Sequence, residues 1–293
     1  MTTTSSVLET KSNSTLDPGT ELACVQVPRA VAVEHVRRMR GGAQPHLMKC
    51  SDGSHYVVKF LDNPQHQRVL ANEWIGARLA AGLGLQVPET ALVEVSEELI
   101  NHSGDLVIDL GRSRRKVGAG LQFGSRYPGD PTEMPAYDFL PDERLAEVEN
   151  LGDFLGMLVF DKWTCNTDGR QAVFYRPQGS LCYRAMMIDQ GFCFNAGEWD
   201  FPDAPLRGLY SRTRVYQAVT GMESFEPWLE RLENGIDEGI LYEITSEIPS
   251  EWYEFNKGAL YRLIEKVSAR RRRVRDLILS AKNTYRQPFP NWK

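Results

Sequence analysis

The spacing of hydrophobic residues changes near the middle of the chain. From residue 25 to residue 127, short apolar and β-branched runs alternate with polar turns, which is the pattern of β-strands. The turn Asp52-Gly53, between two such runs, is a strong hairpin signal. Only Val69–Leu83 has apolar residues at helical spacing. We therefore expect a strand-rich first part that contains one helix.

A proline-rich stretch separates this part from a helical one. Tyr127–Pro141 holds four prolines, so we expect it to be irregular. Apolar residues then recur at spacings of three and four, which predicts a helix from Pro141 to about Trp163. A small hairpin is expected to follow it, with Tyr183–Ile188 as its second strand. This is an α+β pattern in two lobes. We expect a disordered, Ser/Thr-rich tail over residues 1–21, a strand-rich N-lobe over 22–127 and a helical C-lobe over 128–293.

The composition is that of a globular protein. The chain has 293 residues, of which 42% are hydrophobic and 25% charged, and no apolar run is long enough to span a membrane. The five cysteines are an odd number without a C-x-x-C pair, which favours a reducing, cytoplasmic location. All five histidines lie before residue 103, far in sequence from most cysteines, so we expect no Cys–His catalysis.

The net charge of −5 conceals a basic C-terminal segment. From Lys257 to Lys293 there are eleven Lys and Arg residues and only two acidic ones. We expect Arg270–Arg275 to lie on a helix and to pair with the acidic remainder of the chain. The alternative is that they bind an acidic partner or a nucleic acid. A second basic cluster, Arg112–Lys116, has the same two interpretations: a solvated loop, or recognition of an acidic substrate.

Two ionisable residues in the first part interrupt apolar surroundings. Lys59 stands in the strand sequence VVKF, and lysine is rarely buried without a partner. Glu73, fourteen residues later on the predicted helix, is a candidate partner. The pair could hold phosphates in a cleft. The simpler alternative is an edge strand with an outward-facing lysine, and a glutamate on a solvated helix face.

Two aspartates in the second part lie at the ends of apolar segments. Asp168 follows the long predicted helix, in the sequence NTDGRQ, where ordinary turn chemistry also explains it. Asp189 closes the strand AMMID, and a carboxylate at a strand end suits Mg²⁺. The order strand Lys, helix Glu, loop Asp and strand-end Asp is the layout of a protein-kinase-like fold, in which positioning and charge neutralisation drive phosphoryl transfer.

Three runs of the sequence resemble the HipA-type kinases, which are related to phosphoinositide kinases. The runs begin at Tyr56 (YVVKFLDNPQHQRVLANEWIGARLAAGLGLQVPE), Phe160 (FDKWTCNTDGRQAVF) and Met186 (MMIDQGFCF), and the resemblance spans roughly Val25–Tyr285. It implies a two-lobed kinase that uses ATP and Mg²⁺. In such a kinase Lys59 contacts the ATP phosphates and contributes to catalysis, with Glu73 as its ion-pair partner.

The same resemblance implies further site residues. Asp168 is the implied catalytic base and Asp189 the implied metal ligand. The turn Gly41-Gly42-Ala43-Gln44 takes the phosphate-loop position, although an ordinary hairpin turn explains it equally well. The segment Leu121-Gln122-Phe123-Gly124 takes the position of the hinge between the lobes, whose backbone meets adenine. The expected nucleotide-binding residues thus include Gly41, Gly42, Gln44, Gln122, Phe123 and Gly124.

The chain departs from the family pattern after Asp168. The family places a metal-ligating Asn five residues after the catalytic Asp, where this chain has Val173, which cannot coordinate a metal. Gln171 is the nearest residue with a suitable amide oxygen, and we expect it to serve as the second ligand. Arg170 replaces the family's histidine and either neutralises phosphate charge or pairs with Asp168.

These observations predict an ATP- and Mg²⁺-dependent kinase. The expected acceptor is a hydroxyl group, in the first place of Ser or Thr in a protein. Three alternatives remain open from the sequence. One is a small-molecule or lipid kinase on the same core, and another is a weakly catalytic nucleotide-binding protein, motivated by Val173. The third is a nucleic-acid-binding protein that uses its basic helix.

Overall fold

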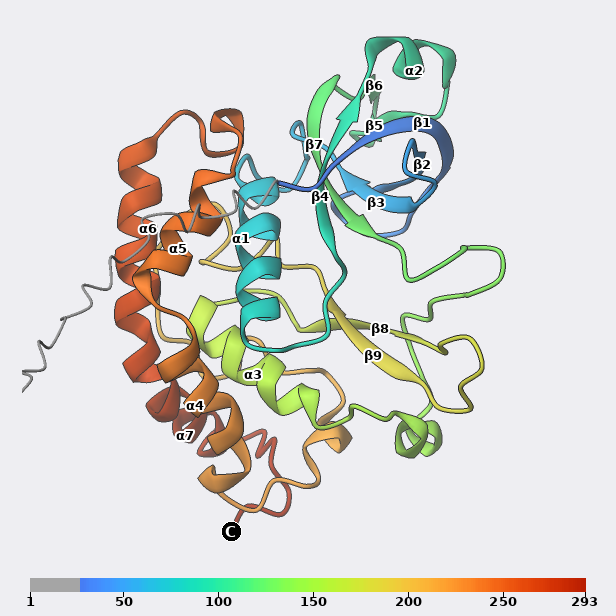
Figure 1. Ribbon diagram of the computed structural model, residues 1–293. Coiled ribbons are helices and arrows are strands. Elements are labelled where there is room, and N and C mark those ends of the chain that lie inside the picture. The colour runs from blue at the N-terminus through green and yellow to red at the C-terminus, as the bar shows by residue number, and fades with distance from the viewer. Residues whose placement is uncertain (1–26) are drawn as a thin grey trace, which may run out of the picture.

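The computed structural model describes residues 27–293, and the predicted disordered tail therefore lies outside the described residues. Five strands close into a barrel in the order β1-β2-β3-β7-β4 (Figure 1). Their bounds are β1 Arg29–Arg38, β2 His46–Cys50, β3 His55–Lys59, β4 Thr90–Val95 and β7 Gly120–Arg126. All neighbours pair antiparallel except β1 with β4, which are parallel. The barrel has an apolar interior of its own, as its alternating sequence requires.

The remaining elements lie around this barrel. A small hairpin, β5 Val107–Asp109 with β6 Arg114–Lys116, and helix α2 Glu97–His102 stand at its outer end (Figure 1). A second hairpin, β8 Gln171–Tyr175 with β9 Arg184–Ile188, lies below it. The other helices are α1 Val69–Gly82, α3 Asp153–Thr164, α4 Glu226–Gly235, α5 Glu238–Ser246, α6 Lys257–Arg270 and α7 Val274–Lys282. The expected mixture of helix and strand is confirmed.

The helix α1 joins the barrel to the helical part. It contacts β4 and β7 on one side and α3 and α5 on the other, and its buried residues belong to the large helical core. Trp74 packs edge-on against Trp252 and donates a hydrogen bond to the backbone oxygen of Ile244. The larger of the two cores therefore extends across the predicted boundary at residue 127.

Two predicted helices are interrupted in the structure. The helix expected from Pro141 to Trp163 is a 3₁₀ helix, Asp142–Glu147, followed by turns and then α3. Asn150 causes the break, because its side chain exchanges two hydrogen bonds with the backbone of Ala185 and fixes an extended approach to the hairpin. The C-terminal helix is likewise divided into α6 and α7 by a 3₁₀ turn at Arg271–Arg273.

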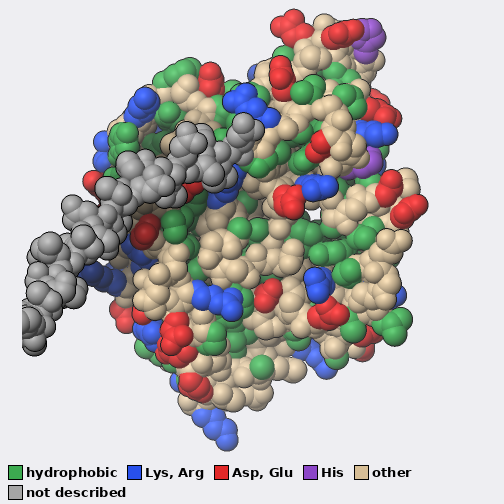
Figure 2. All heavy atoms as spheres, in the orientation of Figure 1, with side chains coloured by type: hydrophobic (Ala, Val, Ile, Leu, Met, Phe, Trp, Pro, Cys, Tyr) green, Lys and Arg blue, Asp and Glu red, His purple; other side chains and the backbone are tan. Residues whose placement is uncertain are grey.

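The basic C-terminal segment pairs with acidic and carbonyl groups. Arg275 forms ion pairs with Glu226 and Glu233, and Arg270 donates to Asp203 and to the backbone oxygen of Lys162. On the face shown in Figure 2, basic and acidic side chains are interspersed. These contacts favour the first interpretation of the sequence, in which the arginines serve the fold.

None of the helices within residues 27–293 is both long and apolar enough to cross a membrane. The four cysteines of the described part, Cys50, Cys165, Cys182 and Cys193, are free thiols.

A buried histidine in the barrel makes its stability depend on pH. His46 is fully buried, its Nδ1 lies 3.0 Å from Nε2 of His35, and its Nε2 has no hydrogen-bond partner among the described residues. Burial, reinforced by His35, lowers the pKa of His46 to about 4. A neutral imidazole is thus required for the folded barrel.

We expect the free energy of unfolding to fall between pH 6.5 and pH 4. In this window His46 is protonated in the unfolded chain but neutral in the folded chain. The contribution of His46 to the free energy of unfolding is therefore fully present above the normal histidine pKa. It is lost as the pH falls toward 4, by up to about 3 kcal/mol. Urea unfolding at several pH values measures this loss. In His46→Gln this part of the slope should disappear, and an unchanged slope would contradict the assignment.

Candidate active site

A buried lysine joins two carboxylates from distant parts of the chain. Lys59 ends β3, Glu73 lies on α1 and Asp189 follows β9, and Nζ of Lys59 forms ion pairs with both carboxylates. Lys59 is 7% exposed and Glu73 is 2% exposed. Burial alone would lower the pKa of Lys59, but the carboxylates of Asp189 and Glu73 outweigh it and raise that pKa. The lysine is therefore a permanent cation at the back of the site.

The carboxylate of Asp189 remains available to a ligand. Burial acts to raise its pKa, but the positive charges of Lys59 and Arg170 prevail and lower it, so the group is ionised. Only one of its two oxygens pairs with Lys59, and about a third of the side chain is exposed. Its φ is 63°, a left-handed conformation that a non-glycine residue adopts only under constraint from its surroundings.

Residues at the start of α1 supply that constraint. Glu73 accepts hydrogen bonds from the backbone N–H groups of Gln190 and Gly191, at 3.1 and 2.7 Å. The buried Asn72 amide donates to the backbone oxygens of Gly191, Cys193 and Ala196 and accepts from the Trp199 indole. The segment that carries Asp189 is thus held to the helix that carries the partner of Lys59.

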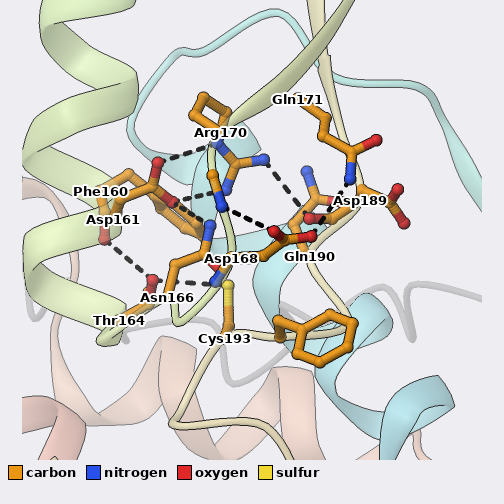
Figure 3. A network of polar contacts seen from close by, with 12 residues as sticks. Phe160, Asp161, Thr164, Asn166, Asp168, Arg170, Gln171, Asp189, Gln190 and Cys193 are labelled. Carbon is orange, nitrogen blue, oxygen red and sulfur yellow. Dashed lines mark hydrogen bonds and ion pairs between the residues drawn. The ribbon is translucent and has the colours of Figure 1, made fainter. Parts of the chain in front are cut away.

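Asp168 and Gln171 lie together on the other side of Asp189. Asp168 is exposed on the loop after α3, and Nε2 of Gln171 lies 3.3 Å from its carboxylate. The loop is shaped by Asn166, which accepts the N–H of Asp168 and donates to Asp161 (Figure 3). Cys165, at φ 54°, ends α3 and turns the chain into this loop.

Val173, which stands where the family has its Asn, lies in a strand in the structure. Strand β8 begins at Gln171, only three residues after Asp168. Gln171 and Val173 alternate with the buried Ala172 and both line the cleft, where Val173 pairs with Met186. Gln171 lies beside Asp168, and Val173 forms part of an apolar floor.

Arg170 has neither of the two roles expected from the sequence. It is buried, binds Asp161 on α3 through two nitrogens, and donates to the backbone oxygen of Ile188 at 2.6 Å (Figure 3). It touches neither Asp168 nor the open cleft, because its side chain is turned toward the core. It connects the loop of Asp168 with the strand that delivers Asp189.

Removing this arginine should greatly destabilise the fold. Arg170→Met leaves Asp161 charged and buried, so we expect a loss of about 3–5 kcal/mol in the free energy of unfolding, measured with urea. The double variant Asp161→Leu/Arg170→Met, which removes both charges, should recover much of this loss. A single variant as stable as the wild type would show that the pair is unimportant to folding.

A cleft of about 620 Å³ lies between the barrel and the β8–β9 hairpin. The β1–β2 turn with Gly41 and Gly42 lies at one wall, with Val57 on the same barrel. Met186, Ile188 and Val173 form the opposite wall. Lys59, Glu73, Asp189 and Gln171 also line the cleft, and so does Phe123.

Three residues expected at the nucleotide do not face this cleft. The side chain of Gln44 is turned to β5, where it exchanges hydrogen bonds with the backbone of Asp109. Gln122 and Gly124 lie inside strand β7, not in a hinge. Gln122 is buried and binds the backbone of Leu61 and Gly118. Gly124 is paired on both sides, and an added Cβ would lie 2.4 Å from Val93.

The connection to the helical part begins after β7. Ser125, Arg126, Tyr127 and Pro128 line the cleft, whereas Gln122 and Gly124 do not. The barrel needs the glycine at position 124 for close packing between its strands.

Two residues that hold the site in position were missed from the sequence. The polar residues Asn72 and Asp161 lie within apolar helices, and such an interruption was the available signal, as it was for Lys59.

The second basic cluster forms ion pairs with acidic side chains: Arg114 lies near Asp109, and Arg115 pairs with Asp62.

Comparisons with known proteins find kinases, by sequence profile and by fold. The profile of a family described as HipA-like kinase matches residues 32–194. The crystal structure of the Helicobacter pylori proinflammatory kinase CtkA superposes with a TM-score of 0.53 at 15% identity, covering 86% of this chain and 99% of that one. The Golgi casein kinase gives a TM-score of 0.49 at 13% identity, covering 89% of this chain and 75% of that one. None of the curated protein sequences matches significantly.

Proposed function

Because this chain belongs to the HipA-like kinase family, we propose that it transfers the γ-phosphoryl group of ATP, with Mg²⁺, to a Ser or Thr hydroxyl of a protein. Membership of the family makes the chain a phosphotransferase with a protein-kinase-like fold. The observation that carries the finer proposal is the position of Lys59, between Glu73 and Asp189, in a cleft that Gln171 also lines.

The cleft suits a nucleotide in size and in chemistry. Its volume of about 620 Å³ lies within the range of small-molecule sites. Apolar walls at Val57 and Met186 would enclose the base, while the buried cation of Lys59 and the N–H groups of the Gly41-Gly42 turn would bind phosphates. We propose that the barrel and the helical part act as the two lobes of this site, with the division near residue 127.

The side-chain oxygens in the cleft suit Mg²⁺, which prefers oxygen ligands and is usually bound through only one or two protein carboxylates. Asp189 offers an ionised carboxylate with one oxygen free of Lys59, and Gln171 offers an amide oxygen, since its Nε2 is directed at Asp168. These two residues would hold the metal ion. When bound, it would neutralise the charge of the phosphates.

The residues of the chain have separable tasks in the transfer. Lys59 holds the nucleotide's phosphates, and Glu73 fixes the ammonium group in place. Asp168, exposed at the cleft mouth, orients the acceptor hydroxyl and takes its proton. Asn166 and Gln171 hold its carboxylate and backbone in position.

Transfer of labelled phosphate tests this function. The full chain is incubated with γ-labelled ATP and Mg²⁺ and with a panel of Ser/Thr peptides, small alcohols and a lipid headgroup. We expect label on peptide hydroxyls. If only small alcohols or the lipid headgroup are labelled, the acceptor is of that class and not a protein. Nucleotide binding without any transfer would contradict the proposal that the chain is catalytic. The cytoplasm, where free thiols persist, is the compartment we propose.

A further inference from the structure

Five basic residues line the cleft, and three of them already have acidic partners. The five are Arg37, Arg38, Arg40, Lys59 and Arg126. Lys59 forms the two ion pairs described above. Arg126 lies 2.7 Å from a carboxylate oxygen of Glu89. Arg38 lies 3.9 Å from a carboxylate oxygen of Asp109. The charges of these three residues are therefore offset within the protein.

The other two basic residues have no such partner. Arg37 lies near the end of β1, and Arg40 directly precedes Gly41 in the β1–β2 turn. Both are exposed, and neither forms an ion pair or a side-chain hydrogen bond within residues 27–293. Asp138, the carboxylate of the lining that does not pair with Lys59, forms no ion pair with either of them. Two unpaired guanidinium groups therefore belong to the wall of the cleft.

The turn that carries these arginines is held in place from two sides. The side chain of Gln44 exchanges hydrogen bonds with the backbone of Asp109 on β5. The amide of Asn63 donates to the backbone oxygen of Ala43 at 3.0 Å. Gly41 has φ 123°, which a residue with a side chain rarely adopts. The backbone of the turn is thus fixed before a ligand binds, so only the arginine side chains remain to be ordered.

The ion-pair group of Lys59 does not attract a triphosphate by charge. Lys59 contributes one positive charge, and Glu73 and Asp189 contribute two negative ones, so the group is negative overall. A nucleoside triphosphate stays negative even when one Mg²⁺ ion offsets part of its charge, and like charges repel strongly in a partly buried cleft. Binding of the phosphates therefore requires further positive charge in the wall.

We propose that Arg37 and Arg40 bind the phosphates of the nucleotide and supply the positive charge that the Lys59 group lacks. A guanidinium group is always charged and can donate two parallel hydrogen bonds to phosphate oxygens. The inference rests on the proposed function, because it takes the cleft as the nucleotide site. Acidic groups of an acceptor are the other anions that these arginines could bind, and the experiment separates the two.

Calorimetric titration of the full chain with ATP and with adenosine, at low ionic strength, tests this inference. We expect Arg37→Gln/Arg40→Gln to bind ATP at least about tenfold more weakly than the wild type, because charge-assisted hydrogen bonds are lost. The affinity for adenosine, which has no phosphates, should be unchanged. A smaller loss for ATP, or an equal loss for adenosine, would overturn the inference and leave the proposed function intact. A wild-type chain that binds no ATP would overturn both.

Two further variants separate this role from general effects. Arg37→Lys/Arg40→Lys keeps the charges and should recover most of the affinity for ATP. Arg214→Gln/Arg262→Gln removes two exposed arginines outside the cleft and changes the net charge by the same amount. It should bind ATP as the wild type does. An equal loss in this control would show that net charge alone governs the affinity and would contradict the proposal.

The acceptor is tested with a neutral and an acidic Ser/Thr peptide at saturating ATP. We expect the ratio of their KM values to be the same in the wild type and in Arg37→Gln/Arg40→Gln. If the variant loses only its preference for the acidic peptide and binds ATP normally, the arginines recognise the acceptor and the proposal is wrong.

Discussion

Asp189→Asn is expected to lower phosphoryl transfer at least about a thousandfold. The carboxylate of Asp189 lines the cleft beside Lys59 and has one oxygen outside that ion pair, so its loss would remove the charged member of the pair proposed to hold the metal ion. Asparagine keeps the size of the side chain and an oxygen that can accept from Lys59, which preserves the local packing. The rate is measured as single-turnover transfer of labelled phosphate over a range of Mg²⁺ concentrations.

The control for this variant is Asp276→Asn, which neutralises an exposed carboxylate on α7. It should retain the wild-type rate. The melting temperature of Asp189→Asn is measured in parallel and the transfer assay is run well below it, which separates lost chemistry from lost folding. Transfer within tenfold of the wild-type rate would exclude Asp189 as the principal metal-holding residue.

Asp168→Asn is expected to reduce kcat by about a hundredfold to ten-thousandfold while KM for ATP changes little. Among the described residues its side chain does not line the cleft and forms hydrogen bonds only with Gly169 and Gln171, so the role proposed for it concerns the acceptor and not nucleotide binding. Steady-state kinetics with a peptide acceptor separate the two parameters. A raised KM for ATP with an unchanged kcat would reverse this assignment.

The sequence indicated Lys59 because it interrupts an apolar strand, Asp189 because it closes one, and Glu73 as a candidate partner of Lys59 on the next helix. Such positions are costly unless a partner is present. It did not indicate that Lys59 also pairs with Asp189, since the two residues are separated by 130 positions and belong to different hairpins. Pairings of this kind depend on tertiary packing, which a single sequence does not reveal.

The errors have local physical causes. Gly124 was assigned to a hinge, whereas the barrel excludes a side chain there because Val93 and Tyr56 pack against it. The segment 141–163 has the apolar spacing of one helix, but the side chain of Asn150 forms two hydrogen bonds with the backbone of Ala185 in the hairpin, and the helix is interrupted there. Arg170 was expected to neutralise phosphate charge or to pair with Asp168, whereas it forms its ion pair with the buried Asp161. In each case a contact in the folded protein outweighed the pattern in the sequence.

The structure sharpened one prediction that the sequence left open. Gln171 was chosen as a metal ligand only because it was near the expected Asn position. The short loop between Asp168 and β8 now gives a geometric reason, since it places Gln171 on the cleft face and beside Asp168. Its role as a ligand remains a prediction.

A crystal structure of the chain with a non-hydrolysable ATP analogue and Mg²⁺ tests the central claim most directly. We predict phosphates at Lys59, a metal ion held by Asp189 and by the amide oxygen of Gln171, and the carboxylate of Asp168 facing the γ-phosphate. A nucleotide bound elsewhere, or a metal ion held without Asp189, would contradict the account.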